Sequence, residues 1–264
     1  MNSPVNFFTK LITAILCLLC SCTVNYAQRV TSGKQPTKIL VLAEKGGHHI
    51  QYSTAARVWL DKRAADNDFV VTYIQDTRPI DEEFLKQFQI FIQLDFPPYA
   101  WTEKAVAAFE KFMQRGEGGW IGIHHATLLG EFDGHPMWKW FSDFMGGIRW
   151  KNYIATFSSG RVNVEQAMHP VMKRIPSYFI VEKEEWYTWD KSPRSNVRVL
   201  ASVDESTYRP NSEVKMGDHP VVWTNEKLPT KNVYIFMGHS PDLFQNQTYV
   251  QLFENSILWM LERK

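Results

Sequence analysis

Short apolar runs alternate with stretches of helical periodicity through the first half of this chain. The runs predict four strands, at 38–44, 68–75, 89–95 and 118–125. The stretches between them predict helices at 51–65, 81–87 and 102–115. Because buried parallel strands read as continuous apolar runs, this alternation indicates a parallel sheet covered by helices on both faces. The expected fold class is therefore α/β, a doubly wound, flavodoxin-like and mostly parallel sheet.

Individual residues support the helix assignments. Asp81 and Thr102 are of the types that cap helix N-termini, and Glu103 lies in a first turn, where the helix dipole favours a carboxylate. The segment 51–65 has helical spacing, with four residues on successive turns: Ala55, Val58, Trp59 and Lys62.

The pattern changes after about Trp150. The following segments read as strands with few helices between them, at 153–164, 178–188 and 197–204. A last strand pair is expected at 220–224 and 231–237, and an amphipathic helix at 246–262. These elements predict an additional antiparallel β extension in the C-terminal half.

The N-terminus has the features of an export signal. Lys10 precedes the apolar run Leu11–Cys20, which is shorter than the ~20 residues that a membrane-spanning helix needs. We expect a signal peptide over 1–27, with lipoprotein-type cleavage before Cys22 as an alternative to cleavage after Ala27. A short tether (28–36) and one α/β domain (37–264) follow. The expected location is the periplasm, or a bacterial membrane reached only through a lipid anchor at Cys22.

Composition excludes several kinds of chemistry. The three cysteines are Cys17, Cys20 and Cys22, so the folded domain contains none. Disulfides, cysteine–zinc sites and a thiol nucleophile are therefore excluded. A formal net charge of +1 gives no electrostatic reason to expect nucleic acid as a partner.

The placement of the eight histidines is the most informative feature of the sequence. His48 and His49 follow the first predicted strand, His124 and His125 close the fourth, and His239 follows the strand that ends at Met237. With strand order 2-1-3-4-5 or 3-2-1-4-5, these strand ends meet at one crevice, where open α/β sheets bind ligands. Purely structural, hydrogen-bonded histidines are the alternative. Because adjacent side chains on a strand point in opposite directions, one histidine of each pair is expected to face the crevice.

Several kinds of chemistry fit such a crevice. Histidine titrates near neutral pH, so His124 or His239 is a candidate general base, with Glu185 orienting or protonating. Three imidazoles with an open position also suit a divalent ion such as zinc or manganese, which predicts His48, His124 and His239 as ligands. No His-x-x-x-His spacing supports the metal. Three tryptophans are candidates to line the pocket, namely Trp138, Trp140 and Trp150.

A set of short motifs gives the chain a family resemblance. They are Gly47-His48-His49, GIHHAT at 122–127, His135 with Trp138 and Phe141, Gly146-Gly147, His169-Pro170-Val171, Glu185-Trp186-Tyr187, PVVWT at 220–224, and Met237-Gly238-His239. In this order the chain resembles the ThuA-like (trehalose utilisation) family over nearly the whole domain. That family is similar in fold to class I glutamine amidotransferases. His124 stands where their nucleophilic cysteine would lie, so amidotransferase activity is not expected.

The resemblance implies sugar metabolism. It points to an enzyme that acts on a disaccharide or glycoside, through a 3-keto derivative made by a partner sugar-oxidising dehydrogenase. Lyase, hydratase, isomerase and hydrolase reactions remain open, with His124, His239 and Glu185 as catalytic candidates. The expected substrate-binding residues are Gly47, His48, His49, His125, His135, Trp138, Trp186 and Tyr187. An exported sugar-binding protein without catalysis is the alternative.

Overall fold

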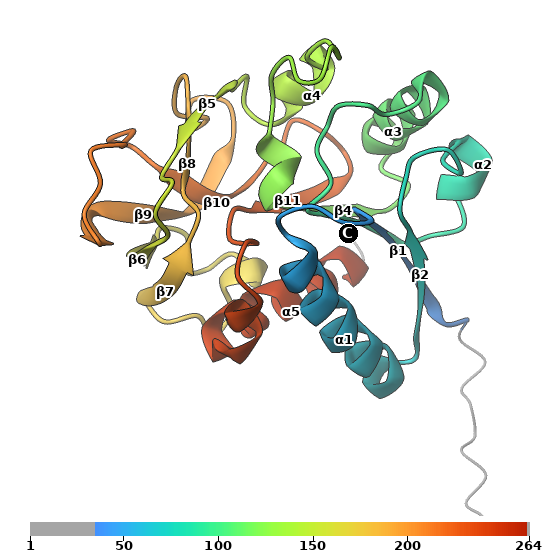
Figure 1. Ribbon diagram of the computed structural model, residues 1–264. Helices are drawn as coiled ribbons and strands as arrows, with labels where there is room; N and C mark the ends of the chain where they lie inside the picture. Colours follow the sequence, from blue (N-terminus) through green and yellow to red (C-terminus); the bar gives the residue numbers. More distant parts are fainter. Residues whose placement is uncertain (1–34, 263–264) are drawn as a thin grey trace, which may run out of the picture. The chain divides into compact units, whose positions relative to one another are not determined.

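The computed structural model describes residues 35–262 (Figure 1). The predicted signal peptide and lipidation site lie outside these residues. The described residues from Pro36 onward form one compact unit. Among residues 35–262, no helix combines the length and apolar character needed to cross a membrane.

Five parallel strands form the first half of a nine-stranded sheet. They are β1 (Thr37–Ala43), β2 (Phe69–Ile74), β3 (Ile90–Leu94), β4 (Gly119–Ile123) and β11 (Lys231–Ile235). They lie in the order β2-β1-β3-β4-β11, which is the 2-1-3-4-5 order anticipated above. The direction of strand order reverses next to β1, so the carboxyl ends of β1 and its neighbours open onto one crevice.

Four antiparallel strands continue the same sheet beyond β11. They are β10 (Pro220–Thr224), β9 (Arg198–Arg209), β6 (Ser158–Val164) and β7 (Tyr178–Glu184). The predicted antiparallel extension is thus confirmed, and it is continuous with the parallel half. The segments 153–164 and 178–188 are not single strands, however. Each divides in two, and β5 (Trp150–Tyr153) pairs with β8 (Tyr187–Trp189) in a separate two-stranded sheet.

Helices cover both faces of the parallel half (Figure 1). On one face lie α1 (Ile50–Asn67) and α5 (Gln247–Leu261), and on the other α2 (Glu82–Leu85) and α3 (Glu103–Arg115). A short α4 (Lys139–Phe144) and three 3₁₀ segments complete the unit, namely η1 (His124–Thr127), η2 (Pro170–Met172) and η3 (Pro241–Gln245). The doubly wound α/β class expected from the sequence is therefore confirmed.

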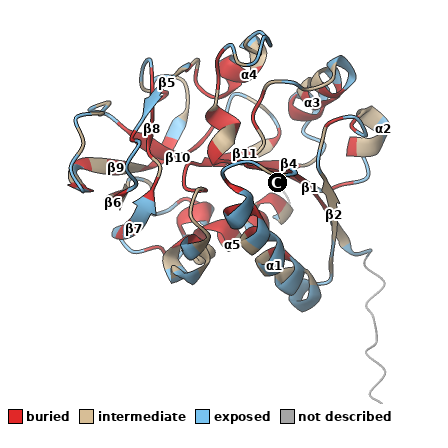
Figure 2. Ribbon diagram, in the orientation of Figure 1, coloured by how far each residue is buried: buried red, intermediate tan, exposed pale blue. Residues whose placement is uncertain are grey.

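Burial follows the sheet (Figure 2). Every residue of β3, β4 and β10 is buried, as their continuous apolar sequences predict. The sequence did not identify the buried face of α1. Val58 is 68% exposed, and the buried residues include Tyr52, Ala56 and Leu60. Because apolar residues occur all around this helix, spacing alone does not identify the face that packs on the sheet.

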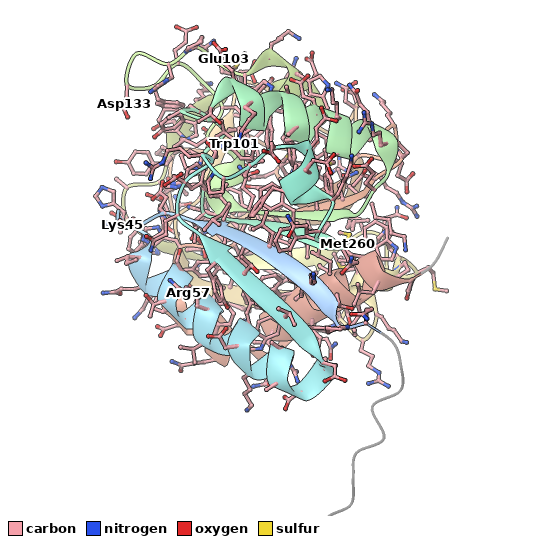
Figure 3. The ribbon with its side chains drawn as sticks, turned by 90° about the vertical axis from the view of Figure 1, so that its right-hand side faces the viewer. Lys45, Arg57, Trp101, Glu103, Asp133 and Met260 are labelled. Atoms are coloured by element: carbon pink, nitrogen blue, oxygen red, sulfur yellow. The ribbon has the colours of Figure 1, made fainter. Side chains whose placement is uncertain are left out.

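The loops at the carboxyl ends of the strands gather on one side of the unit. Figure 3 shows Lys45, which follows β1, and Asp133, which follows η1, on the same side, opposite Met260 near the end of α5. The first of these loops carries His48 and His49. The chain therefore presents its histidine-bearing loops along one edge.

The N-cap of α3 gives a direct test of the local folding signal. The Thr102 hydroxyl accepts a hydrogen bond from the amide of Ala105 at 3.3 Å. Replacing Thr102 with alanine leaves that amide without its partner, so we expect the free energy of unfolding to fall by about 1 kcal/mol. Urea denaturation measures this change. Thr102→Ser retains the hydroxyl, and a loss as large as that of the alanine variant would contradict the capping role.

Candidate functional site

A cavity of about 550 Å³ lies at the carboxyl ends of β1, β4 and β11. His48 and His49 reach it from the loop after β1, His125 from η1, and His239 from the loop after β11. Leu128 also comes from the parallel half, just after η1, whereas Glu185 lies between β7 and β8. The other lining residues belong to the two-stranded β5–β8 sheet or to the loop after β5: Trp150, Tyr153, Ala155, Phe157 and Tyr187. The ends of the parallel strands and the β5–β8 sheet with its flanking loops thus both contribute to the cavity.

Four side chains converge beside this cavity. His49, His124, Glu185 and His239 each offer one ligand atom, and all four atoms lie within 4.8 Å of one another. One carboxylate oxygen, Glu185 Oε2, lies 3.3 Å from His124 Nε2, 3.5 Å from His239 Nδ1 and 3.6 Å from His49 Nε2. A tetrahedral ion with bonds of about 2.1 Å separates its ligand atoms by roughly 3.4 Å. These three distances fit such an ion.

His124 is held at a sharp strand-to-helix turn. It directly follows β4 and has φ of 40°, a left-handed conformation that is unfavourable for a residue with a side chain. Hydroxyl groups of Thr127 and Tyr234 both donate to its carbonyl, at 3.1 and 2.9 Å. Because His124 and His125 begin a 3₁₀ segment, their side chains do not point to opposite faces as they would in a strand. Their rings stack instead, with 5.5 Å between the ring centroids.

Hydrogen bonds fix the form of the His124 ring. Its Nδ1 lies 2.8 Å from the carbonyl oxygen of Phe236, and because a carbonyl only accepts, Nδ1 carries the proton. In a neutral ring, Nε2 is then a bare acceptor that faces a carboxylate oxygen at 3.3 Å. Two acceptors at this distance need a proton or a cation between them. A backbone carbonyl that orients an imidazole in this way is typical of metal-ligating histidines.

The electrostatics favour neutral imidazoles around an ionised carboxylate. Burial, with the neighbouring histidines, lowers the pKa of His49 to about 2, and burial also lowers the pKa of His124 to about 4. Burial alone would raise the pKa of the Glu185 carboxyl, but protons donated by the facing ring nitrogens of His124, His239 and His49 would hold that pKa low, and a cation among them would have the same effect. Neutral imidazole and ionised carboxylate are the forms that bind divalent ions.

Two further carboxyl groups lie behind this group. Glu184 is fully buried, and its Oε1 accepts hydrogen bonds from the amides of His239 and Glu185 at 3.0 and 3.3 Å. Burial raises the pKa of Glu184 to about 8 and that of the buried Asp95 well above its usual range. Glu184 therefore anchors the backbone of two ligand-bearing residues, and burial disfavours its ionised form.

The structure places the predicted site residues in three groups. His48, His49, His125, Glu185, Tyr187 and His239 line the cavity, and His124 lies fully buried against Glu185. In the four-residue group, His49 occupies the place for which the sequence suggested His48, which is exposed. Of the three candidate tryptophans, Trp150 lines the cavity.

The remaining predicted residues lie outside the cavity lining. The Trp186 indole is fully buried and donates to the carbonyl of Ser158 at 2.7 Å. Trp138 donates to Glu110 and packs with Trp101 and Phe109 under α3. Gly47 has φ of 85°, a conformation that favours glycine, and His135 lies in an exposed loop.

Sequence reasoning missed several residues at the site. Tyr153 and Phe157 line the cavity, and Glu44 lies 3.7 Å from His125. Asp95 was detectable, because it closes the strand run at 89–95 just as the histidines close theirs. Tyr153 and Phe157 gave no such signal, since their exposure on the cavity side depends on how β5 and the following loop fold.

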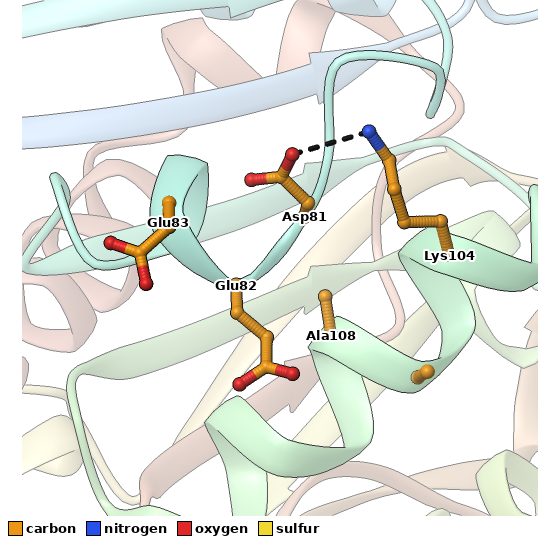
Figure 4. A pocket seen from close by; sticks show the side chains of 6 residues that line it. Asp81, Glu82, Glu83, Lys104 and Ala108 are labelled. Atoms are coloured by element: carbon orange, nitrogen blue, oxygen red, sulfur yellow. Dashed lines mark hydrogen bonds and ion pairs between the residues drawn. The ribbon is translucent and has the colours of Figure 1, made fainter.

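A second hollow has a structural explanation. It lies between α2 and α3, has a volume of about 410 Å³ and is lined by Asp81, Glu82, Glu83, Lys104, Ala107 and Ala108 (Figure 4). Lys104 pairs with Asp81 at 3.2 Å, and Lys111 and Arg115 pair with Glu82. Its carboxylates are neutralised by their neighbours, so it is a salt-bridged junction between two helices.

The fold and the site together define a doubly wound α/β protein with a three-histidine, one-glutamate group at the strand-order reversal. Comparison identifies the family. The family model described as "Trehalose utilisation" (ThuA) matches residues 38–260, and the chain belongs to this family. Its family is thus one of carbohydrate utilisation.

Solved structures agree. A ThuA-like protein from Bacteroides uniformis is 30% identical with a TM-score of 0.78, over 89% of this chain and 96% of that one. A ThuA-like protein from Parabacteroides merdae is 17% identical with a TM-score of 0.64, over 87% and 93%. A carbohydrate deacetylase, Agd3, shares the fold at 12% identity with a TM-score of 0.54, over 85% of this chain and 32% of that one. A search of curated proteins finds no match.

The close approach of two strand ends at the site can be tested. A Cβ atom at Gly238 would lie 2.6 Å from both His124 Cβ and Ile123 Cγ2. We expect Gly238→Ala to displace His124 and to lower the free energy of unfolding by about 1–3 kcal/mol. Urea denaturation and the histidine NMR signals report these effects.

Gly46→Ala is the matched control, because nothing lies within 4 Å of the added atom. Its unfolding free energy should stay within about 0.5 kcal/mol of the parent protein. Equal stability of the two variants would refute the predicted close packing at Gly238.

Proposed function

We propose that this protein is a divalent-metal-dependent enzyme that acts on a keto-sugar glycoside, such as a 3-keto-disaccharide. The convergence of three imidazoles and one carboxylate on a single point beside the cavity carries the proposal. The membership in a trehalose-utilisation family supports a sugar substrate. A sugar-oxidising dehydrogenase would supply the ketone, and export to the periplasm or to a lipid-anchored position is part of the same proposal.

The four residues fit a zinc or manganese ion. They combine imidazole nitrogens with a carboxylate oxygen, the donor set found in catalytic zinc sites. Both ring nitrogens of His49 are buried without a hydrogen-bond partner, as is Nδ1 of His239. Buried polar atoms without partners are unfavourable, and a bound ion would satisfy one nitrogen of each ring. When bound, such an ion polarises a substrate carbonyl and stabilises the negative charge that develops on it.

A separate residue is then available as the general base. His124 and His239 serve as ligands, so the base role that the sequence suggested for them passes to His125. Its Nδ1 lies 3.2 Å from the carbonyl oxygen of Asp95 and 3.7 Å from Glu44 Oε1. Because these groups accept, Nδ1 carries the proton and Nε2 is the acceptor. His125 lines the cavity, where Nε2 can take the acidic proton beside a substrate ketone.

Metal binding is tested first, on protein purified without a histidine tag. After EDTA treatment, we expect one equivalent of zinc or manganese to bind and to raise the thermal unfolding temperature. Glu185→Gln removes the one carboxylate of the group, so its metal affinity should fall at least about 100-fold. His135→Gln is the control and should bind as the parent does. A parent protein that binds neither ion and shows no thermal shift would exclude the metal role.

Turnover is tested separately by NMR with 3-keto-trehalose and 3-keto-glucosides. The metal-loaded protein should form a new product, and EDTA should abolish it. His125→Gln should retain the metal but lower the rate by roughly 10²–10⁴, as expected for a lost general base. Full activity of His125→Gln would remove that role. Tight binding of a sugar that is recovered unchanged would favour the alternative, a sugar-binding protein without catalysis.

A further inference from the structure

A strip of aromatic rings leads out of the cavity. Tyr153 and Trp150 line the cavity, and their rings stack with a distance of 6.3 Å between the ring centroids. The ring centroids of Trp150 and Phe132 lie 5.9 Å apart, and those of Phe132 and Tyr99 lie 5.3 Å apart. Tyr99 in turn stacks with His135 at 6.3 Å. We call these five residues the aromatic strip. The proposed metal and base chemistry does not use this continuous series of rings.

We propose that the aromatic strip is a second binding position, which accepts the ring beyond the reacting sugar. This inference rests on the proposed function and narrows its substrate class to uncharged glycosides with at least two rings. The reacting sugar lies in the cavity beside His125 and Glu185, against Trp150 and Tyr153. The second ring, either a sugar or a cyclic aglycone, lies over Phe132 and Tyr99.

A local irregularity turns Trp150 and Tyr153 to the same side. In a regular strand, residues three apart point to opposite faces. In β5 the pairing with β8 shifts, because Trp150 pairs with Trp189 while Asn152 pairs with the next residue, Thr188. This bulge places one extra residue in β5 and reorients its side chains. As a result both rings face the cavity, and a bulge next to an active site commonly has such a role.

The chemistry of the strip suits sugars. Tyr153 is 41% exposed and His135 is also exposed, while the other three are half-buried, so ring faces and edges remain accessible. The negative face of an aromatic ring attracts the weakly positive C–H groups that one side of a sugar ring presents. Aromatic rings also lose little conformational freedom on binding, because few of their bonds rotate.

The charges favour an uncharged ligand. None of the residues that line the cavity is lysine or arginine. Phosphate groups are usually bound by arginine, lysine or helix N-termini. Partial burial first, and then the charges of Asp133 and Glu44, raise the pKa of Tyr99, so carboxylates lie near the strip. A phosphate on the second ring would meet repulsion at this end of the strip, whereas an uncharged ring would not.

Calorimetry on metal-loaded His125→Gln protein tests the strip without turnover. The probes are 3-keto-trehalose, 3-keto-glucose and the 6-phosphate of trehalose. Tyr99→Ala and Phe132→Leu should each weaken 3-keto-trehalose binding by roughly threefold to tenfold and leave 3-keto-glucose unchanged. Trp150→Ala should weaken both keto-sugars. The phosphate should bind at least about tenfold more weakly than 3-keto-trehalose.

Tyr178→Ala is the matched control, since Tyr178 is 55% exposed on β7 and lies outside the strip. Tyr99→Leu, checked by circular dichroism and thermal unfolding, repeats the test if the alanine variant folds poorly. For the Tyr99 and Phe132 variants, equal loss for both keto-sugars or no loss for either would overturn the strip. Tight phosphate binding, or no sugar binding at all by the parent protein, would also overturn it. Selective loss without any turnover by the parent protein would sustain the strip and refute the enzyme.

Discussion

The candidate site depends on one unfavourable juxtaposition. A single carboxylate oxygen of Glu185 faces three ring nitrogens at 3.3–3.6 Å, in a region where burial disfavours charged imidazoles. The neutral His124 ring directs its Nδ1 proton to the carbonyl of Phe236, so its Nε2 offers no proton to Glu185. The surrounding structure nevertheless fixes them firmly, through the carbonyl of Phe236, the strained turn at His124 and the buried carboxyl of Glu184. Such rigid convergence of acceptors is the arrangement that suits a cation.

The two halves of the sheet have different roles in this arrangement. The parallel half provides histidines at the ends of β1, β4 and β11, where the strand order brings loops together. The antiparallel half leads, after β7, to Glu185, and the separate β5–β8 sheet carries the cavity aromatics Trp150, Tyr153 and Tyr187. The site therefore does not exist in either half alone. Its assembly depends on β11, which pairs in parallel with β4 and antiparallel with β10.

The sequence predicted the parallel half well, because its strands are continuous apolar runs and its ligand edge follows from topology. It also placed His124, His239 and Glu185 among the candidates. It suggested His48 as a ligand where the structure groups His49, because the loop after β1 has no fixed periodicity and the choice depends on how α1 begins. It joined β5 to β6 and β7 to β8, because the breaks at residues 154–157 and 185–186 contain apolar residues that continue the pattern. The aromatic strip spans two loops and strand β5, and it became visible only in three dimensions.

Because of the bulge in β5, the orientation of the Trp150 and Tyr153 rings depends on the number of residues between them. One residue more or fewer between Trp150 and Tyr153 would turn one of the two rings away from the cavity, while the histidines at the ends of β1, β4 and β11 would stay in place. Proteins with this fold could thus come to prefer different ligands through single-codon insertions or deletions in β5. The histidines at the strand ends would remain unchanged. Comparisons of such proteins by substitution patterns alone would overlook this route.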